Sequence, residues 1–126
     1  MTSIKFLKKY IKDFSSMEIS KIEKYYNLPI VILNTKLENK PIVILKNRKD
    51  FRKYFFNLFN ILKKIYNYKL TKIEDIKLLK KNNKYQILQI FAKRYNKKKL
   101  IIKKLHIQYI LEKKLNRFKI ISFLIK

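Results

Sequence analysis

Four side chains in this sequence have the chemistry to bind or orient a small molecule: Tyr10, Tyr54, His106 and Tyr109. A tyrosine combines an apolar ring with a hydrogen-bonding hydroxyl, and a histidine gains or loses a proton near neutral pH. We identify these four as candidates for lining a ligand pocket and assign no catalytic residue. Each has a structural alternative, because the tyrosines recur at helical or strand spacing and a lone histidine is commonly a hydrogen-bonded or interface residue. The alternation around His106 leaves open which face of its strand it occupies.

The composition excludes several kinds of active site. The chain has no Cys and no Gly, which rules out thiolate metal sites, cysteine nucleophiles and a glycine-rich phosphate loop. One histidine without clustered carboxylates cannot form a zinc site. The adjacent acids Glu74 and Asp75 point to opposite faces of a strand and cannot act as a pair. The sequence therefore predicts no metal and no cofactor, and it leans against an enzyme without settling the question.

The net charge is extreme, since 33 Lys and Arg residues stand against 8 Asp and Glu and give +25. Such a charge suits RNA, a ribosome-like assembly or another anionic partner, with Lys97–Lys99, Lys103-Lys104 and Lys113-Lys114 as candidates for a basic edge. Nearly all of these residues are Lys, whereas bidentate recognition of phosphate or guanine prefers Arg. The Lys-, Ile- and Asn-rich composition is also what AT-rich coding favours. A basic scaffold is therefore the second hypothesis, and a solvated, edge-protecting lysine surface is its alternative.

The length of 126 residues and the hydrophobic content of 48% fit one domain, which we expect to span residues 1–126. The uncharged runs, such as 27–35 and 54–62, are too short to cross a bilayer. Lysines interrupt the apolar run that a secretion signal would need at the N-terminus. We expect a cytoplasmic protein that does not span a membrane.

The stretch Asn47–Asn67 organises the predicted fold. Asn47 is suited to cap a helix, Asp50 lies near the positive end of the helix dipole, and Asn67 tolerates the left-handed conformation that ends a helix. Between them, apolar side chains recur at helical spacing: Phe51, Tyr54, Phe55, Leu58, Leu62 and Ile65. The pattern predicts a long helix with a wide aromatic face, which a curved sheet must cover.

Around this helix the sequence predicts two further helices, two short strands and a four-stranded meander. The helices are expected at Ile4–Phe14 and, capped by Ser15 or Ser16, around Ile19, Ile22, Tyr25 and Tyr26; the strands are expected at Ile30–Leu33, Pro41–Leu45, Leu70–Leu79, Tyr85–Tyr95, Leu100–Glu112 and Phe118–Ile125. Asparagines must form the turns, because the chain has no Gly. The order α-α-β-β-α-β-β-β-β predicts an α+β cone, with helices packed in a curved, mostly antiparallel sheet.

The last predicted strand is apolar on both faces. One face carries Phe118, Ile120 and Leu124, and the other carries Ile121, Phe123 and Ile125. One of them must meet the long helix. Because monomers rarely expose contiguous apolar patches, we expect a homodimer through the outer sheet face. The alternative is a long core strand with a charged rim.

Several segments resemble the nuclear-transport-factor-2-like superfamily, also called cystatin-like or SnoaL-like. These segments are Phe6–Phe14, Met17–Ile19, Ile22–Tyr26, Leu28–Val31, Phe91–Tyr95, Tyr109–Lys113 and Arg117–Ile121. The resemblance covers essentially the whole chain in order and length. It implies a cone with a pocket between sheet and helices, often dimeric, on which functions range from isomerases, cyclases and dehydratases to non-catalytic adaptors.

The ketosteroid-isomerase branch of that superfamily uses a first-helix Tyr, which donates to the developing oxyanion, and a carboxylate shortly after the second helix. Tyr10 matches the first position. The carboxylate should fall near Leu33 or Asn34, and neither can act as a base, so we do not expect this chemistry. The leading hypothesis is a cone-fold protein that binds a small apolar or aromatic ligand in its pocket, with no catalysis assigned.

Overall fold

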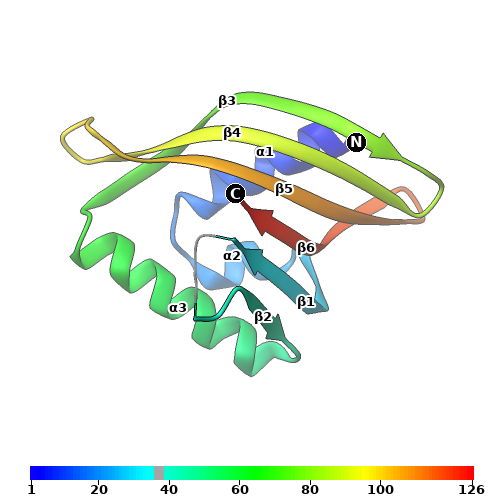
Figure 1. The fold of residues 1–126 in the computed structure, drawn as a ribbon, viewed down its shortest axis with the longest axis horizontal. Coiled ribbons are helices and arrows are strands. Elements are labelled where there is room, and N and C mark those ends of the chain that lie inside the picture. The colour runs from blue at the N-terminus through cyan, green and yellow to red at the C-terminus, as the bar shows by residue number, and fades with distance from the viewer. Residues whose placement is uncertain (36–38) are drawn as a thin grey trace.

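The computed structural model describes residues 1–35 and 39–126, which form three helices and six strands (Figure 1). In chain order these are α1 (Ser3–Phe14), α2 (Ile19–Glu23), β1 (Tyr26–Asn34), β2 (Ile42–Leu45), α3 (Arg48–Lys64), β3 (Tyr68–Lys81), β4 (Tyr85–Asn96), β5 (Ile101–Lys114) and β6 (Arg117–Ile125). This is the predicted order of elements. The predicted connection Asn34–Lys40 lies partly outside the described residues.

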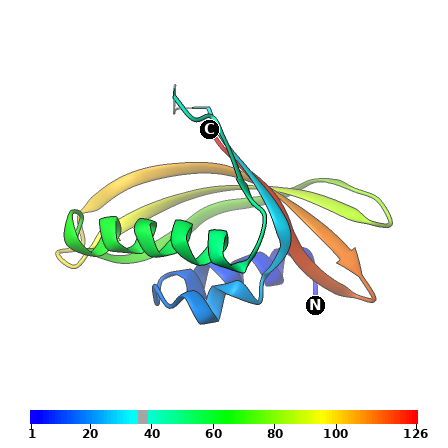
Figure 2. The same ribbon diagram turned by 90° about the horizontal axis from the view of Figure 1, so that it is seen from below.

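The six strands form one curved sheet in the order β2-β1-β6-β5-β4-β3. Neighbouring strands are antiparallel except β1 and β6, which are parallel. Figure 2 shows the helices lying on the concave side of the sheet. The predicted α+β cone, with a mostly antiparallel sheet wrapped around the helices, is therefore confirmed.

The long helix α3 forms where its sequence predicts, but Ile65, predicted on its apolar face, is the C-cap residue and is 70% exposed. Asn47 caps its N-terminus by accepting a hydrogen bond from the backbone N–H of Asp50 at 2.9 Å. Asn67 takes the left-handed conformation, with φ of 53°, just after the helix. The helix turns one face towards the sheet, and its buried residues are Phe51, Phe55, Phe59 and Leu62. Their spacing of three and four residues places them on a single stripe.

The second helix is shorter than predicted. α2 ends at Glu23, and Tyr26 is the first residue of β1 instead of a helical residue. The ring of Tyr26 is buried 5.1 Å from the ring of Phe51, so packing against α3 outweighs the local helical pattern. The predicted serine cap is also wrong. Glu18 is the N-cap residue, while Ser15 is the C-cap residue of α1 and its hydroxyl bonds to the backbone of β3.

Strand β6 departs from its predicted alternation. Its register with β5 shifts at Ile121, which is an extra residue on β6. Because a one-residue insertion reverses the alternation of side chains, Phe118, Ile120 and Phe123 are all buried on the inner face. Leu124 therefore lies on the outer face, and the prediction that it shares a face with Phe118 and Ile120 is wrong.

Asparagines form the tight connections of the meander, as predicted. The side-chain oxygen of Asn82 accepts hydrogen bonds from the backbone two and three residues further on, between β3 and β4. Asn96 does the same two and four residues further on, between β4 and β5. Asn116, with φ of 62°, turns the chain between β5 and β6.

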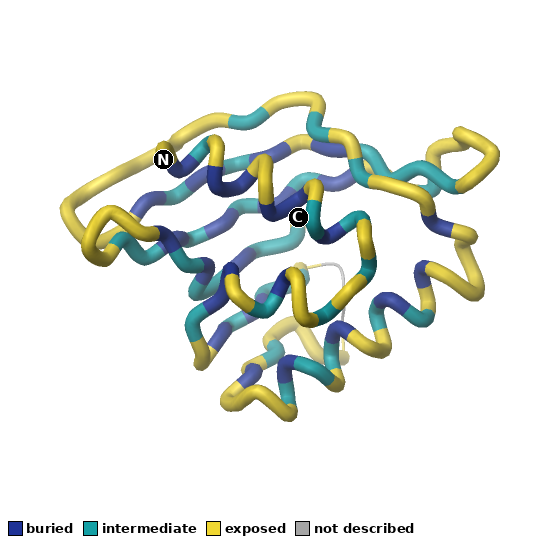
Figure 3. The backbone as a smooth tube through the Cα atoms, turned by 180° about the vertical axis from the view of Figure 1, so that it is seen from behind, coloured by how far each residue is buried: buried dark blue, intermediate teal, exposed yellow. Residues whose placement is uncertain are grey.

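The core lies between the inner face of the sheet and the helices α1 and α3, as the buried segments in Figure 3 show. Strand β3 differs from its neighbours because it is an edge strand, and most of its residues are exposed. Helix α1 covers it in part, and the backbone N–H of Thr71 donates to Ser15 Oγ at 3.1 Å. Strands β4, β5 and β6 supply many of the buried residues of this core.

Candidate ligand-binding cavity

A recessed cavity of about 150 Å³ lies between the two longer helices and the inner face of the sheet. Helix residues Tyr10, Phe14, Tyr54, Phe55 and Leu58 line it, together with strand residues Asn34, Arg94, Lys103, Leu105, Ile107, Tyr109, Phe123 and Ile125. The structure thus brings together Tyr10, Tyr54 and Tyr109 of the residues that the sequence suggested. It does not bring His106 to them.

The hydroxyl groups in and beside the cavity are protonated at neutral pH. Tyr10 lies on the buried face of α1, and its hydroxyl hydrogen-bonds to the hydroxyl of Tyr26. The ring of Tyr109 lies 6.1 Å from the ring of Tyr10. Burial raises the pKa of Tyr10, Tyr26, Tyr54 and Tyr109 above the usual value. These groups therefore serve as hydrogen-bond donors and acceptors and not as bases.

Arg94 is the polar residue of the cavity that the sequence analysis missed. It continues the inward-facing series Leu88, Ile90 and Ala92 on β4. Its Nε atom is buried and has no hydrogen-bond partner among the residues that the structure describes. The guanidinium carbon lies 5.7 Å from the centre of the Phe14 ring, within cation–π range. Burial lowers the pKa of Arg94, and the nearby tyrosine hydroxyls oppose that shift.

A weak signal for Arg94 was present in the sequence. The chain uses arginine at only four positions, and Arg94 is the one that follows an alternating strand pattern at the inward positions. Arginine remains charged when buried, because its intrinsic pKa is far above neutral. An inward arginine in a lysine-rich chain is therefore a candidate for a specific internal contact.

The other polar side chains of the cavity are an amide and a second cation. Asn34 lies at the position where the ketosteroid-isomerase resemblance places a carboxylate. Lys103 is paired with Arg94 in the register of β4 and β5, and it lines the same cavity. Within residues 1–35 and 39–126, no carboxylate lines this cavity. The described lining thus offers positive charge, neutral hydrogen-bonding groups and apolar surface.

His106 occupies the opposite, outer face of the sheet. Its neighbours Leu105 and Ile107 line the cavity, so the alternation of β5 turns the imidazole away from it. His106 Nε2 lies 2.9 Å from Gln89 Oε1, and the imidazole stacks on Phe91 at 4.2 Å between ring centres. The imidazole therefore has its contacts with neighbouring strand residues on that outer face.

The outer face carries exposed apolar side chains at the other end of the sheet. Ile42 and Ile44 on β2 are 56% and 52% exposed. In the strand register Ile42 pairs with Leu33, which in turn pairs with Leu124. These residues give three adjacent strands an apolar outer surface.

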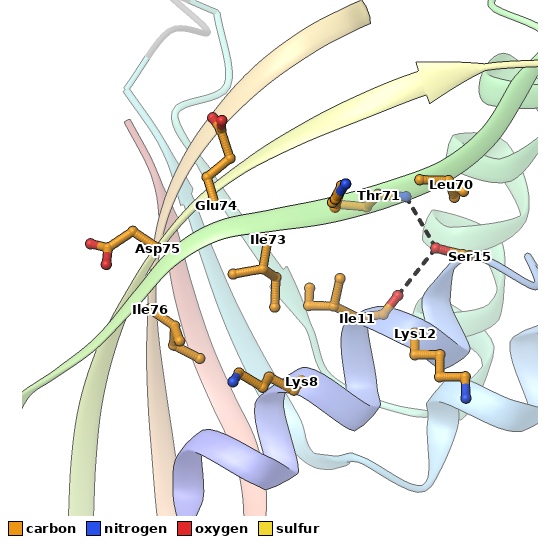
Figure 4. A pocket seen from close by; sticks show the side chains of 11 residues that line it. Lys8, Ile11, Lys12, Ser15, Leu70, Thr71, Ile73, Glu74, Asp75 and Ile76 are labelled. Atoms are coloured by element: carbon orange, nitrogen blue, oxygen red, sulfur yellow. Dashed lines mark hydrogen bonds between the residues drawn. The ribbon is translucent and has the colours of Figure 1, made fainter. Parts of the chain in front are cut away.

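A wider surface groove lies between α1 and β3, and Figure 4 shows its walls. Ile11, Ile73 and Ile76 form an apolar floor, while Lys8 lies at its rim. Glu74 on β3 also lines the groove, and it forms an ion pair with Lys93 at 3.1 Å. The groove is more open to the surface than the cavity between the helices and the sheet.

The predicted basic edge is divided between two ends of the sheet. Lys97–Lys99 lie in the turn between β4 and β5, whereas Lys113-Lys114 lie at the far end of β5. The 14 residues of β5 separate them by about 45 Å. Near the first cluster, a surface hollow is lined by Lys69, Leu70, Lys72, Tyr95, Asn96, Lys97 and Lys99.

The described part of the chain has neither a cluster of metal ligands nor a membrane-spanning helix. No group of three or more His, Asp and Glu residues there is arranged to hold a metal ion. No helix there has the length and the apolar character needed to cross a bilayer.

Comparison with solved structures places the fold in a known class. A protein of unknown function with a cystatin-like fold from Nostoc punctiforme superposes with a TM-score of 0.73 at 9% identity, over 97% of this chain and 85% of that one. A putative ketosteroid isomerase from Shewanella frigidimarina gives 0.72 at 10% identity, over 97% and 92%. A putative aromatic ring hydroxylase from Novosphingobium aromaticivorans gives 0.69 at 8% identity, over 97% and 83%. At these identities the likeness concerns the fold alone.

The family is defined by sequence as well. Residues 3–126 match the family described as NTF2-like protein (DUF6841), and the chain belongs to this family. The resemblance to the nuclear-transport-factor-2-like superfamily is thereby confirmed. Among curated proteins, none matches the chain.

Proposed function

We propose that this protein binds a small molecule with an apolar or aromatic body in the cavity lined by Tyr10, Tyr54 and Tyr109. The observation that carries the proposal is the combination of a recessed cavity, mostly apolar walls and a few polar groups directed into it. Ligand sites in proteins commonly have this composition, with apolar walls for affinity and sparse polar groups for orientation.

The cavity volume limits the size of the ligand. At about 150 Å³ it is comparable to engineered apolar cavities that take up benzene. A single six-membered ring or a short branched chain fits this volume, whereas a fused-ring compound needs the cavity to open. The proposal assigns no reaction, because the tyrosines are protonated and the described lining contains no carboxylate.

A neutral probe tests this proposal. Titration with benzyl alcohol, followed by two-dimensional amide NMR, should shift the resonances of inner-face residues on β4 and β5. Leu58→Phe should fill the cavity and weaken binding about tenfold or more, while Ile61→Phe, on the exposed face of the same helix, should leave it unchanged. Unperturbed inner-face resonances at saturating probe would contradict the proposal.

We also propose that a second copy of the chain covers the outer sheet face. The exposed Ile42 and Ile44, beside the outer-face residues Leu33 and Leu124, support this contact. Two copies carrying +25 each repel one another, so the apolar contact has to outweigh a repulsion that salt screens.

The hollow beside Tyr95 favours a second candidate function, the binding of single-stranded RNA. Four lysines surround it, and an aromatic ring among cations is the arrangement on which bases stack while phosphates are neutralised. The double change Lys72→Gln and Lys97→Gln should then weaken RNA binding and reduce its salt dependence. The control is the double change Lys113→Gln and Lys114→Gln at the far end of β5. If the two double variants weakened RNA binding equally, RNA binding would be a general effect of charge and not a property of the hollow.

A further inference from the structure

We propose that the ligand of the cavity carries a carboxylate, and that the guanidinium of Arg94 binds it. This inference rests on the proposed function of the same site and adds the chemical class of the ligand. It is carried by the position of Arg94, which lines the cavity from the inner face near the C-terminal end of β4.

The Nε–H group of Arg94 lacks the hydrogen-bond partner that a buried donor requires. Among the residues that the structure describes, no acceptor contacts the buried Nε and no ion pair includes Arg94. Removing a charged group from water is costly unless hydrogen bonds and an opposite charge replace the lost hydration. The other arginines of the helical layer show the usual solution, since Arg48 and Arg52 both bind Glu23 at 3.1 Å. Arg94 is thus a partly buried cation whose buried Nε–H has no acceptor among the described residues.

The groups around Arg94 compensate its charge only weakly. The Phe14 ring offers its face at 5.7 Å, and the hydroxyls of Tyr10, Tyr54, Tyr68 and Tyr109 lie close enough to influence its pKa. Because burial raises the pKa of Tyr10, Tyr54 and Tyr109, these three hydroxyls remain protonated and contribute dipoles and no negative charge. The same hydroxyls can donate hydrogen bonds to an anion that Arg94 attracts. Lys103, opposite Arg94 in the strand register, adds a second positive group to the lining.

The shape of the guanidinium and the size of the cavity favour a carboxylate among anions. A guanidinium presents parallel N–H groups that match the two oxygens of a planar carboxylate. The remaining wall, formed by Phe55, Leu58, Leu105 and Ile107, is apolar and suits a hydrocarbon body. A volume of about 150 Å³ then accommodates a ligand the size of benzoate or of a short branched-chain carboxylic acid.

Calorimetric titration with three probes of similar size separates the charge from the body of the ligand. Benzoate, benzamide and benzyl alcohol are compared at one ionic strength, with the wild-type chain and with R94Q, R94K and R117Q. Wild type should bind benzoate roughly 10- to 100-fold more tightly than either neutral probe. R94Q should remove this preference while the neutral probes still bind, and R94K should retain part of it. R117Q removes one exposed positive charge outside the cavity and should change nothing.

Each remaining outcome overturns a defined part of the account. Neutral probes that bind as tightly as benzoate would show that water satisfies Arg94, which overturns this inference and leaves the proposed function standing. Benzoate binding that weakens equally in R94Q and R117Q, or that vanishes at moderate salt, would place the anion on the lysine-rich surface, because salt screens exposed charges more than buried ones. No binding of any probe would overturn both proposals. The wild-type comparison of the three probes decides the matter even if R94Q does not fold.

Discussion

Both faces of the sheet carry polar groups in apolar surroundings, but the hydrogen bonding of these groups differs between the faces. On the outer face, Gln89 and His106 hydrogen-bond to one another at 2.9 Å, and Gln108 lies within 3.5 Å of the same oxygen. On the inner face, Arg94 extends into a cavity, and its buried Nε has no hydrogen-bond partner in the described part of the chain. The outer polar groups hydrogen-bond to one another, whereas the inner one, Arg94, has a donor without an acceptor among the described residues.

This contrast indicates at which of the two faces a bound ligand would gain most from new hydrogen bonds. A polar cluster that satisfies its own hydrogen bonds gains little from a further partner, while a buried cation without an acceptor gains a great deal. The same two strands, β4 and β5, supply both clusters through the alternation of their side chains. The contrast therefore supports the proposed small-molecule site on the inner face.

The largest expected difference between the faces is in stability. Leu111 has no exposed surface and Ile110 is its partly exposed neighbour on the same strand. Leu111→Ala should lower the free energy of unfolding by about 2–5 kcal/mol, because it leaves a cavity in the core. Ile110→Ala should cost less than about 1 kcal/mol at low protein concentration. Urea unfolding of both variants measures this, and equal losses would contradict the assignment of the faces.

A charge on the outer face should disrupt the proposed homodimer. Leu124→Lys places an ammonium in the apolar contact and should raise the dimer dissociation constant about tenfold or more, which is at least about 1.4 kcal/mol. Added salt should strengthen the wild-type dimer, since it screens the repulsion between the two basic chains. Sedimentation velocity across a concentration series measures both effects. A monomer at all concentrations, with or without Leu124→Lys, would contradict the outer-face contact.

Alkaline pH should destabilise the fold through the inner-face tyrosines. Burial raises the pKa of Tyr10, Tyr26 and Tyr109 in the folded chain, while their unfolded pKa stays near about 10. Their contribution is fully present below that pH and is lost as the pH rises towards the folded pKa, by roughly 1.4 kcal/mol per tyrosine for each pH unit. Absorbance at the tyrosinate band should show these residues ionising only as the chain unfolds. Ionisation near pH 10 within the folded state would contradict their burial.

The smallest expected effect concerns an ion pair outside both faces. Burial would raise the pKa of Glu23, but hydrogen bonds from Arg48 and Arg52 outweigh it, and the pKa is lowered. The stability contributed by this contact is present above the unfolded pKa of about 4.3 and is lost as the pH falls through the folded value. Because both arginines are well exposed, Glu23→Gln should cost less than about 1 kcal/mol at neutral pH. A loss of several kcal/mol in thermal unfolding would show that the contact matters more than its exposure implies.

The features that depend on local pattern could be predicted from the sequence. Asn47 and the aromatic stripe define α3, and the asparagine turns define the meander, because capping, periodicity and left-handed tolerance act within a few residues. The same periodicity placed Tyr10, Tyr54 and Tyr109 on inward faces. These positions followed once the superfamily resemblance supplied the arrangement of the elements.

The features that depend on distant contacts could not be predicted. The extra residue Ile121 reverses the faces of β6, and the burial of Tyr26 against α3 shortens the second helix. Arg94 was missed for a related reason, since its contact with the Phe14 ring joins β4 to the distant helix α1. The face of His106 was left open, because a single polar residue in an apolar alternation fits either side.

A crystal structure of the protein grown with benzoate tests the central claim most directly. We expect the ring to lie among Tyr10, Tyr54 and Tyr109, with both carboxylate oxygens within hydrogen-bonding distance of the Arg94 guanidinium. A cavity that contains only water while benzoate lies on the lysine-rich surface would contradict the claim that the inner face of this sheet is the binding site.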